Sequence, residues 1–226
     1  MSKTLPENRV LRHPECGHYD AQTINAIIDE AYFCHVAATR KGMPVIIPTL
    51  HVRIGNMLYI HGAVAAGLFK DLQAQTPVSI AITLLDGLVL ARSLYNHSAN
   101  YRSVVAYGVA REVTDRDEKW AVMEALADRV APGRWGDARQ PNDVELKITR
   151  VFAIPLDHAS AKIRSGPPHD DPEDMGRDTW AGVIPLSVHR LRPEADPAQD
   201  PPLPLPDYLT GATGDAWDQA QGRPAP

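Results

Sequence analysis

The sequence predicts a mainly β fold of the α+β type, an antiparallel barrel of about six strands with peripheral helices. Apolar and β-branched runs are joined by turn dipeptides, namely Lys41-Gly42, Gly55-Asn56 and Asp86-Gly87. The strands expected between residues 78 and 113 have no helix between them, whereas a parallel α/β sheet needs one after most strands. A chain of 226 residues suits one such domain with appendages.

The first half of the chain is expected to begin with a polar arm and a capped helix. Asp20 can cap this helix, and Ile24, Ile27, Ile28 and Ala31 repeat at helical spacing on one face. The following elements are then expected: strands Phe33–Thr39, Pro44–Ile54 and Met57–Ile60, a corner His61-Gly62-Ala63, and a short helix Ala66–Gln73. A strand that enters a Gly/Ala-rich corner before a helix can present free backbone N–H groups to an anion.

The second half continues with hairpin-linked strands and one longer helix. Strands are expected at Val78–Leu85, Leu88–Ser93, Tyr101–Val113, Val144–Ile154 and Ala159–Arg164, with a hairpin turn at Asp86-Gly87. Asp115 and Glu118 resemble a capping box at the start of a helix that reaches Val130. Its expected buried stripe consists of Trp120, Met123, Ala127 and Val130.

Three segments follow from these patterns. Residues 1–19 form an N-terminal arm, residues 20–190 the barrel domain, and residues 191–226 a flexible tail. Eight of the 20 prolines lie in that last segment, at positions 193–226. Such a composition buries too little apolar surface to offset the entropy of ordering.

The composition excludes several classes of protein. A net charge of −5 and a pI of about 6.0 give no basis for binding nucleic acid or an anionic membrane surface. No apolar run approaches the ~20 residues of a membrane span, and the N-terminus lacks the apolar segment of a signal peptide. We therefore expect a cytoplasmic protein. His13, Cys16 and His18 are too isolated to predict a metal site, and no G-x-S-x-G, P-loop or G-x-G-x-x-G motif occurs.

Several short motifs occur in an ordered series: G-x-P-x-x-I-P at residues 42–48, Y-I-H-G-A at 59–63, D-G-L-V-L-A-R-S at 86–93 and N-Y-R-S-V-V at 100–105. With S-A-K-I-R at 160–164 and W-A-G-V-I-P at 180–185, this series resembles the flavin-binding proteins related to pyridoxamine 5′-phosphate oxidase. Within them it is similar to the branch of nitroimidazole-resistance proteins. The resemblance covers roughly residues 19–186 and implies a split-barrel homodimer with flavin at the interface.

The resemblance assigns His61 to the flavin face, where it could donate a hydrogen bond or proton to bound substrate. A histidine at a strand end whose ring is satisfied by backbone is the alternative. Lys70 would contact the flavin phosphate, or simply face solvent. Gly67 stands where relatives often carry Arg or Lys, which weakens the expected phosphate clamp. Gly62 and Ala63 complete the cofactor corner.

Further cofactor contacts follow from the same resemblance. Backbone groups of Pro44, Val45, Ile46 and Ile47 would meet the pyrimidine end of the ring. Arg102 and Ser103 would lie near the phosphate, with Arg102 as a replacement cation, although both could be ordinary outward-facing residues. Lys162 would lie close to the same phosphate. Trp180 would stack near the flavin across the dimer, or plug the barrel.

Three functional hypotheses remain open. The first is an FMN-dependent oxidoreductase acting on a small, nitroaromatic or heterocyclic substrate, with the flavin carrying the electrons. The second is a binding protein of the same fold that holds a flavin (FMN or FAD), deazaflavin or haem without turnover. The third is a partner-binding protein with an empty barrel that uses the Pro-rich tail.

Overall fold

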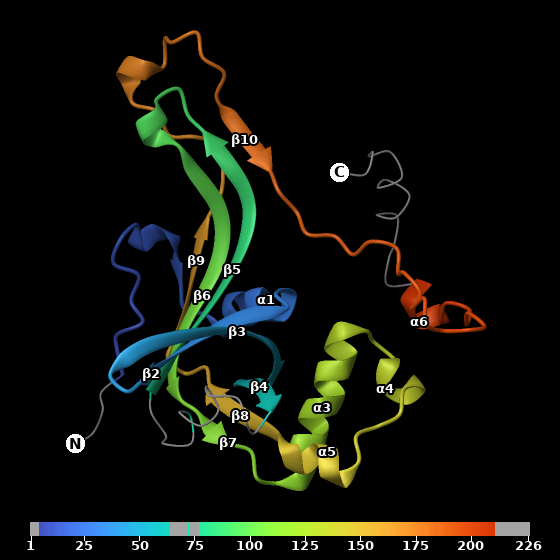
Figure 1. The fold of residues 1–226 in the computed structure, drawn as a ribbon. Coiled ribbons are helices and arrows are strands. Elements are labelled where there is room, and N and C mark those ends of the chain that lie inside the picture. The colour runs from blue at the N-terminus through green and yellow to red at the C-terminus, as the bar shows by residue number, and fades with distance from the viewer. Residues whose placement is uncertain (1–4, 64–71, 73–76, 211–226) are drawn as a thin grey trace.

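The computed structural model describes residues 5–63, 72 and 77–210. All of its strand pairs are antiparallel, and they form one strongly curved sheet (Figure 1). The strands are β1 Gly17–His18, β2 Phe33–Arg40, β3 Met43–Ile54, β4 Met57–Ala63, β5 Pro77–Leu90, β6 Ser98–Val109, β7 Arg111–Glu112, β8 Thr149–Pro155, β9 Ala159–Arg164 and β10 Gly182–Pro185. The helices are α1 Ala21–Glu30, α3 Arg116–Val130, α4 Arg134–Asp137, α5 Asp143–Ile148 and α6 Asp207–Thr210.

The sheet closes because one stretch of chain serves both of its ends. The hydrogen-bonded order runs β6-β5-β2-β3-β4-β8-β7, and β7 continues from β6 after the single residue Ala110. The long strand expected from Tyr101 to Val113 is therefore divided in two. If β6 and β7 are counted as one position, the ring has six positions: β6/β7, β5, β2, β3, β4 and β8. This arrangement confirms the predicted barrel. β9 and β1 extend the sheet beside β6.

The barrel core lies against α1. Ile24, Ile27 and Ile28 of this helix are buried and pack with buried side chains of the surrounding strands. The side chain of Asp20 accepts a hydrogen bond from the backbone N–H of Thr23 at 2.8 Å, which satisfies one free donor of the first turn. The predicted helix and its cap are confirmed.

The predicted hairpin at Asp86-Gly87 is wrong. β5 runs through both residues without interruption, and its pairing with β6 shifts in register here. The glycine is explained by β10, because a Cβ on Gly87 would lie 2.9 Å from Val183 Cγ1 and 3.0 Å from the carbonyl oxygen of Ile184. The dipeptide therefore marks a bulge at a close approach of another strand. The chain reverses later, around the 3-10 turn at residues 94–96.

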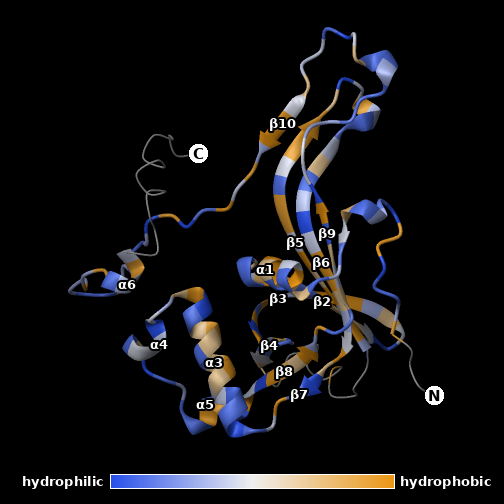
Figure 2. Cartoon of the chain, turned by 180° about the vertical axis from the view of Figure 1, so that it is seen from behind, coloured by the Kyte–Doolittle hydropathy of each residue, from blue (hydrophilic) through white to orange (hydrophobic). Residues whose placement is uncertain are grey.

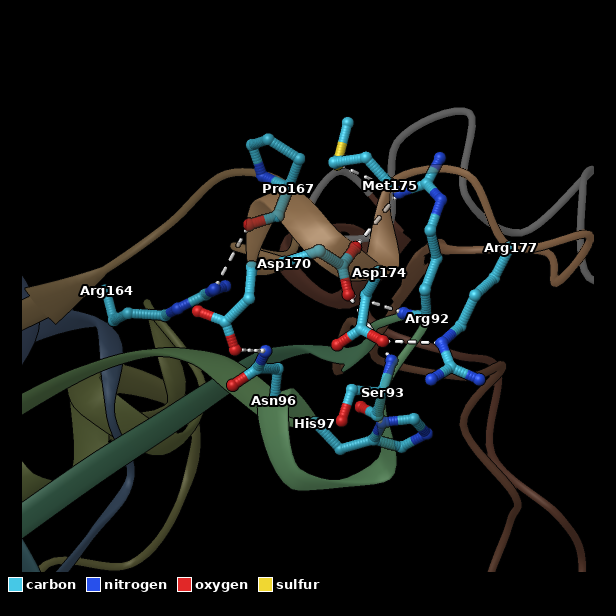
Figure 3. Close-up of polar contacts among 11 residues, drawn as sticks. Arg92, Ser93, Asn96, His97, Arg164, Pro167, Asp170, Asp174, Met175 and Arg177 are labelled. Carbon is cyan, nitrogen blue, oxygen red and sulfur yellow. Dashed lines mark hydrogen bonds and ion pairs between the residues drawn. The ribbon is translucent and has the colours of Figure 1, made fainter.

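This longer hairpin projects from the barrel as an arm, residues 85–101 with 165–185 (Figure 1). Figure 3 shows the polar contacts that fix its outer loop. Asp170 accepts hydrogen bonds from the backbone N–H of Arg92 at 2.7 Å and from the guanidinium of Arg92 at 2.9 Å. Arg164 donates to the carbonyl of Pro167 at 3.1 Å, as Figure 3 shows, and also to the side chain of Asn100. The Asp170 side chain is only 1% exposed, so its bonds are protected from water.

Hydrophobic residues follow the strands of the arm, away from α1 and α3 (Figure 2). Several of them are exposed: Leu85 by 47%, Leu88 by 43% and Ile184 by 45%. At the turn, Tyr95 is 91% exposed. The arm thus presents apolar surface that the described part of the chain leaves exposed.

The strand predicted for residues 144–154 begins only at Thr149. Residues 143–148 form α5 instead, because the side chain of Asn142 accepts two backbone N–H bonds while Glu145 accepts one from the backbone N–H of Asn142. This reciprocal capping box outweighs the alternating pattern of apolar residues. The strand predicted at residues 159–164 is confirmed as β9.

The N-terminal arm is tied to the sheet by β1, which pairs with β9. The C-terminal strap, residues 187–210, runs from β10 back toward α4 and ends in α6 (Figure 1). The helix predicted at residues 66–73, apart from Leu72, and the last part of the predicted flexible tail lie outside the described residues. None of the described helices has both the length and the apolar character required to cross a membrane.

Candidate functional site

β3 and β4 separate at the point where the predicted cofactor residues begin. Their hydrogen-bonded register ends at the pair His51 and Ile60. In the described part of the chain, residues 43–50 pair only with β2 and residues 61–63 only with β8. Each of these segments therefore has one edge whose backbone N–H and C=O groups lack a strand partner. Pro44, Val45, Ile46 and Ile47 lie along one edge, and His61, Gly62 and Ala63 along the other.

The strand edge of β3 is also unusually exposed for its composition. Ile46 is 63% exposed and the adjacent Ile47 is 39% exposed, although successive side chains of a strand point to opposite faces. Both faces of this apolar segment are thus accessible. An apolar strand with a free edge is suited to contact a flat aromatic ring or another protein surface.

A cavity of about 440 Å³ lies beside the split. Leu50 and His61 line it from the two strands, directly after the last β3–β4 pair. The other lining residues come from the helical region, β8 and the intervening loop: Met123, Leu126, Ala127, Val130, Arg134, Trp135, Ala138, Arg139, Pro141, Glu145 and Thr149. Its volume falls in the range of small-molecule and cofactor sites, and a mostly apolar wall with few polar groups is typical of them.

The helical wall of this His61 pocket is tied to the barrel by polar contacts. The ammonium group of Lys119 in α3 donates to the carbonyl oxygens of Leu146 at 2.7 Å and Thr149 at 2.6 Å. The hydroxyl of Tyr59 in β4 donates to Glu118 at 3.0 Å. These bonds join α3 to α5, β8 and β4, which gather at the same end of the barrel (Figure 1).

Three of the four residues in the stripe predicted for α3 line the pocket, whereas Trp120 does not. Val122 and Leu126 are the buried residues of this helix, whereas Val130 is 53% exposed. Met123, Ala127 and Val130, which were expected in the core, face the cavity instead. The helical spacing of these apolar residues correctly predicted a covered face of α3. That face borders a cavity, however, and is not filled by packed side chains.

His61 is neutral and partly buried at this pocket. Its Nδ1 atom is buried and has no hydrogen-bond partner among the described residues. Burial lowers the pKa of His61 below its usual 6.5, since desolvation disfavours the imidazolium form. No described backbone group accepts from or donates to Nδ1, the one ring atom on which the backbone-satisfied alternative can be compared with the structure. A neutral imidazole carries one lone pair that can accept a proton or bind a metal ion.

Two arginines stand at the rim of the pocket. Arg139 forms a bidentate pair with Glu145, at 2.7 and 3.0 Å, and this pairing lowers the pKa of Glu145 to about 2. Arg134 donates to Asp137 at 3.0 Å. The side chains of both arginines are at least half exposed. A ligand with acidic substituents could exchange these protein carboxylates for its own.

Ser103 and Lys162 are brought together in a second, smaller cavity. They are register partners in β6 and β9, and both line a cavity of about 240 Å³ beneath the N-terminal arm. The hydroxyl of Ser103 donates to the carbonyl of Lys162 at 3.3 Å, and the ammonium group of Lys162 donates to the carbonyl of Arg12 at 2.8 Å. Their proposed phosphate contact stays a prediction.

Two other predicted residues, Arg102 and Trp180, line neither of these two cavities. Arg102 forms ion pairs with Glu30 and Asp86, which raise the pKa of its guanidinium and join α1 to the arm. Trp180 precedes β10 on the arm, is 67% exposed, and lies over Gly182. Lys70 lies outside the described residues.

The sequence reasoning missed the pocket residues that follow α3. Trp135 meets Trp120 edge to face at 5.3 Å, and Arg134 and Arg139 flank it. Two arginines and a tryptophan within six residues of a Pro-Gly helix stop were the available signal. In the described residues, no group of three or more His, Cys, Asp or Glu side chains could hold a metal ion.

Residues 20–163 match the family model described as pyridoxamine 5′-phosphate oxidase. No curated protein sequence matches the chain. The flavocytochrome Anf3 from Azotobacter vinelandii is 37% identical, with a TM-score of 0.86 over 92% of this chain and 99% of that one.

Two further structures place the fold more broadly. The FAD and haem binding protein from Mycobacterium smegmatis is 33% identical, with a TM-score of 0.84 over 88% of this chain and 98% of that one. A candidate 5-nitroimidazole antibiotic resistance protein from Bacteroides thetaiotaomicron is 24% identical, with a TM-score of 0.55 over 65% and 86% of the two chains. This last likeness concerns the fold alone.

Proposed function

The chain belongs to the pyridoxamine 5′-phosphate oxidase family, and from this premise we propose that it is a flavin-binding oxidoreductase that also binds haem in the His61 pocket. The observation that supports this proposal most directly is the pocket itself. Its volume is about 440 Å³, its wall is mostly apolar, and it is lined by a neutral histidine. Two relatives that match most of the chain support the same conclusion, since one is a flavocytochrome and the other an FAD and haem binding protein.

The flavin site in this proposal is the split between β3 and β4. The free backbone edge at Pro44–Ile47 would bind the polar end of the ring, and the exposed side chains of Ile46 and Ile47 would pack against its apolar part. FMN is the flavin that the sequence resemblance implies, whereas the Mycobacterium relative is named for FAD. A second copy of the chain would cover the site from the other side, as in a homodimer with cofactor at the interface.

The residues of the pocket fit haem in three respects. The apolar wall suits a planar macrocycle, the unpaired His61 ring suits its iron, and Arg134 and Arg139 at the rim suit its two carboxylates. When both groups are bound, the flavin supplies two-electron chemistry and the haem supplies one-electron chemistry. The protein contributes position, exclusion of water and charge compensation.

This proposal assigns His61 a different role from the predicted proton donor. An acid must carry its proton near the working pH, but burial lowers the pKa of His61. A metal ligand must instead be deprotonated, and the same shift favours that state. The small substrate expected from the resemblance would then approach the flavin from the split, not through a protonated His61.

The test is an absorption spectrum during titration of the purified protein with FMN, FAD and hemin. We expect a perturbed flavin band that saturates with one flavin, and a sharp Soret band that saturates with hemin. His61→Ala should lose the Soret band of ligated haem while the flavin band remains, because the backbone of β3 at residues 44–47, which the substitution does not change, supplies flavin contacts in this proposal.

His97→Ala is the matched control, since this histidine is exposed on the arm and should leave both spectra unchanged. Hemin binding with the same Soret band in His61→Ala would contradict the assigned ligand. Failure of the wild-type protein to bind hemin, with flavin binding intact, would leave a flavoprotein without haem.

A further inference from the structure

The C-terminal strap contacts the His61 pocket from outside at two places. The first is Arg190, whose guanidinium donates to the hydroxyl of Tyr32 at 2.8 Å and to the carbonyl of Val130 at 2.9 Å. The guanidinium also lies over the Tyr32 ring, 5.4 Å from its centroid. Val130 belongs to the pocket wall, so Arg190 fixes the strap to the end of α3.

The second contact is Tyr208 in α6. Its hydroxyl donates to Asp137 at 2.7 Å and accepts from the guanidinium of Arg134 at 3.0 Å. The side chain is seated on Gly133, where a Cβ would lie 3.3 Å from Tyr208 Cβ and Cγ. Gly133 has φ of 91°, a value that favours glycine. The Pro-Gly stop after α3 therefore creates the place on which the strap rests.

These contacts bear on the pocket through Arg134. This residue lines the cavity, but its side chain is half exposed and belongs to α4, a helix of only four residues. A free arginine on such a surface samples many rotamers, and ordering it costs conformational entropy when a ligand binds. Tyr208 and Asp137 together hold the guanidinium before any ligand arrives, which reduces that cost.

We propose that Tyr208 is a positioning residue of the His61 pocket, through which the C-terminal strap sets Arg134 and slows the release of a ligand carrying carboxylates. This inference rests on the proposed function, since haem is the ligand with which it is tested. In this proposal the strap covers the outer side of the pocket and can be displaced from it. Displacement of residues 187–210 would remove the Tyr208 contact, leave Asp137 to hold Arg134 without it, and make the pocket more open to exchange.

The test measures transfer of haem from the loaded full-length protein to excess apomyoglobin, followed at the Soret band. Tyr208→Phe keeps the ring on Gly133 and removes only the hydroxyl. We expect roughly twofold to tenfold faster release, the range for loss of one hydrogen bond. Tyr95→Phe is the matched control, because Tyr95 is 91% exposed on the arm; its release rate should equal that of the wild type.

A double-mutant cycle separates positioning from general loosening. If Tyr208 acts through Arg134, then Tyr208→Phe should have no further effect in the Arg134→Met background. Equal acceleration in both backgrounds, or no acceleration at all, would overturn the inference while haem binding itself stands. A wild-type protein without a Soret band would overturn the haem proposal and this inference together, before any variant is compared.

Discussion

His51 shows at the scale of one residue how burial couples the barrel to pH. Its side chain is 1% exposed, its Nε2 lies 3.0 Å from the carbonyl of Ile28, and its Nδ1 has no partner among the described residues. Desolvation lowers the pKa of His51 below 6.5, and the charge of Arg129 acts in the same direction. The carbonyl of Ile28 fixes the tautomer with the proton on Nε2.

We predict that part of the acid sensitivity of the fold comes from this histidine. Because the folded pKa lies below the unfolded value, the unfolded chain binds the proton first as pH falls below about 6.5. The free energy of unfolding should therefore decrease from pH 7.5 to 5.5. His51→Gln, which keeps a donor but does not titrate, should show a smaller decrease in urea denaturation at the two pH values. An unchanged difference between the two pH values would refute the assignment.

At the scale of elements, the pairing of β5 with β10 depends on one glycine. We predict that Gly87→Ala destabilises the fold by about 1–3 kcal/mol, the usual cost of overpacking, because the added Cβ would meet Val183 and the backbone of Ile184. Thermal or urea denaturation measures the change. Gly176→Ala, with nothing within 4 Å of the added carbon, is the control on the same arm.

A second substitution checks the cause. Val183→Ala removes the nearest atom and should recover part of the loss in Gly87→Ala, but not all of it, since the carbonyl of Ile184 remains 3.0 Å away. Full stability of Gly87→Ala on its own would show that β10 can shift without cost.

The elements that sequence reasoning placed correctly are those with local causes. The Asp20 cap and the isoleucine spacing of α1, and the turns at Lys41-Gly42 and Gly55-Asn56, act within a few residues. The errors come from distant partners or competing local signals. Gly87 reflects a strand almost a hundred residues later, and the alternation after Val144 lost to the capping box at Asn142.

The candidate site was predictable only on its strand side. His61 and Pro44–Ile47 were identified through a resemblance, and the structure places them on the two edges of the split. The helical wall was not found, because Met123 and Val130 have the same pattern whether they face a core or a cavity. Arg134 and Tyr208 meet across 74 residues, a contact that no local pattern contains.

At the scale of the whole molecule, the exposed apolar surfaces of β3 and the arm favour a homodimer. We predict a particle of twice 24.8 kDa by sedimentation, and Ile46→Glu should shift it toward the monomer and weaken flavin binding. The physical reason is the cost of burying an unpaired carboxylate in an apolar interface.

The control for this prediction is Val144→Glu. Val144 is 66% exposed on α5, away from the strand edges, so the same apolar-to-acid change should leave mass and flavin binding unaltered. A wild-type monomer that binds flavin fully would contradict the proposed interface.

The pairing of β4 with β8 also determines the order in which the barrel can assemble. His61 is opposite Val151, 90 positions later, whereas β5 and β6 are neighbours in the chain and can form a hairpin in microseconds. During synthesis, the edge of β4 stays uncovered until β8 has left the ribosome, and such edges are prone to wrong pairing. The β5–β6 hairpin can therefore form before the pocket exists, and a chaperone that shields the edge of β4 during this interval would protect the nascent chain from wrong pairing.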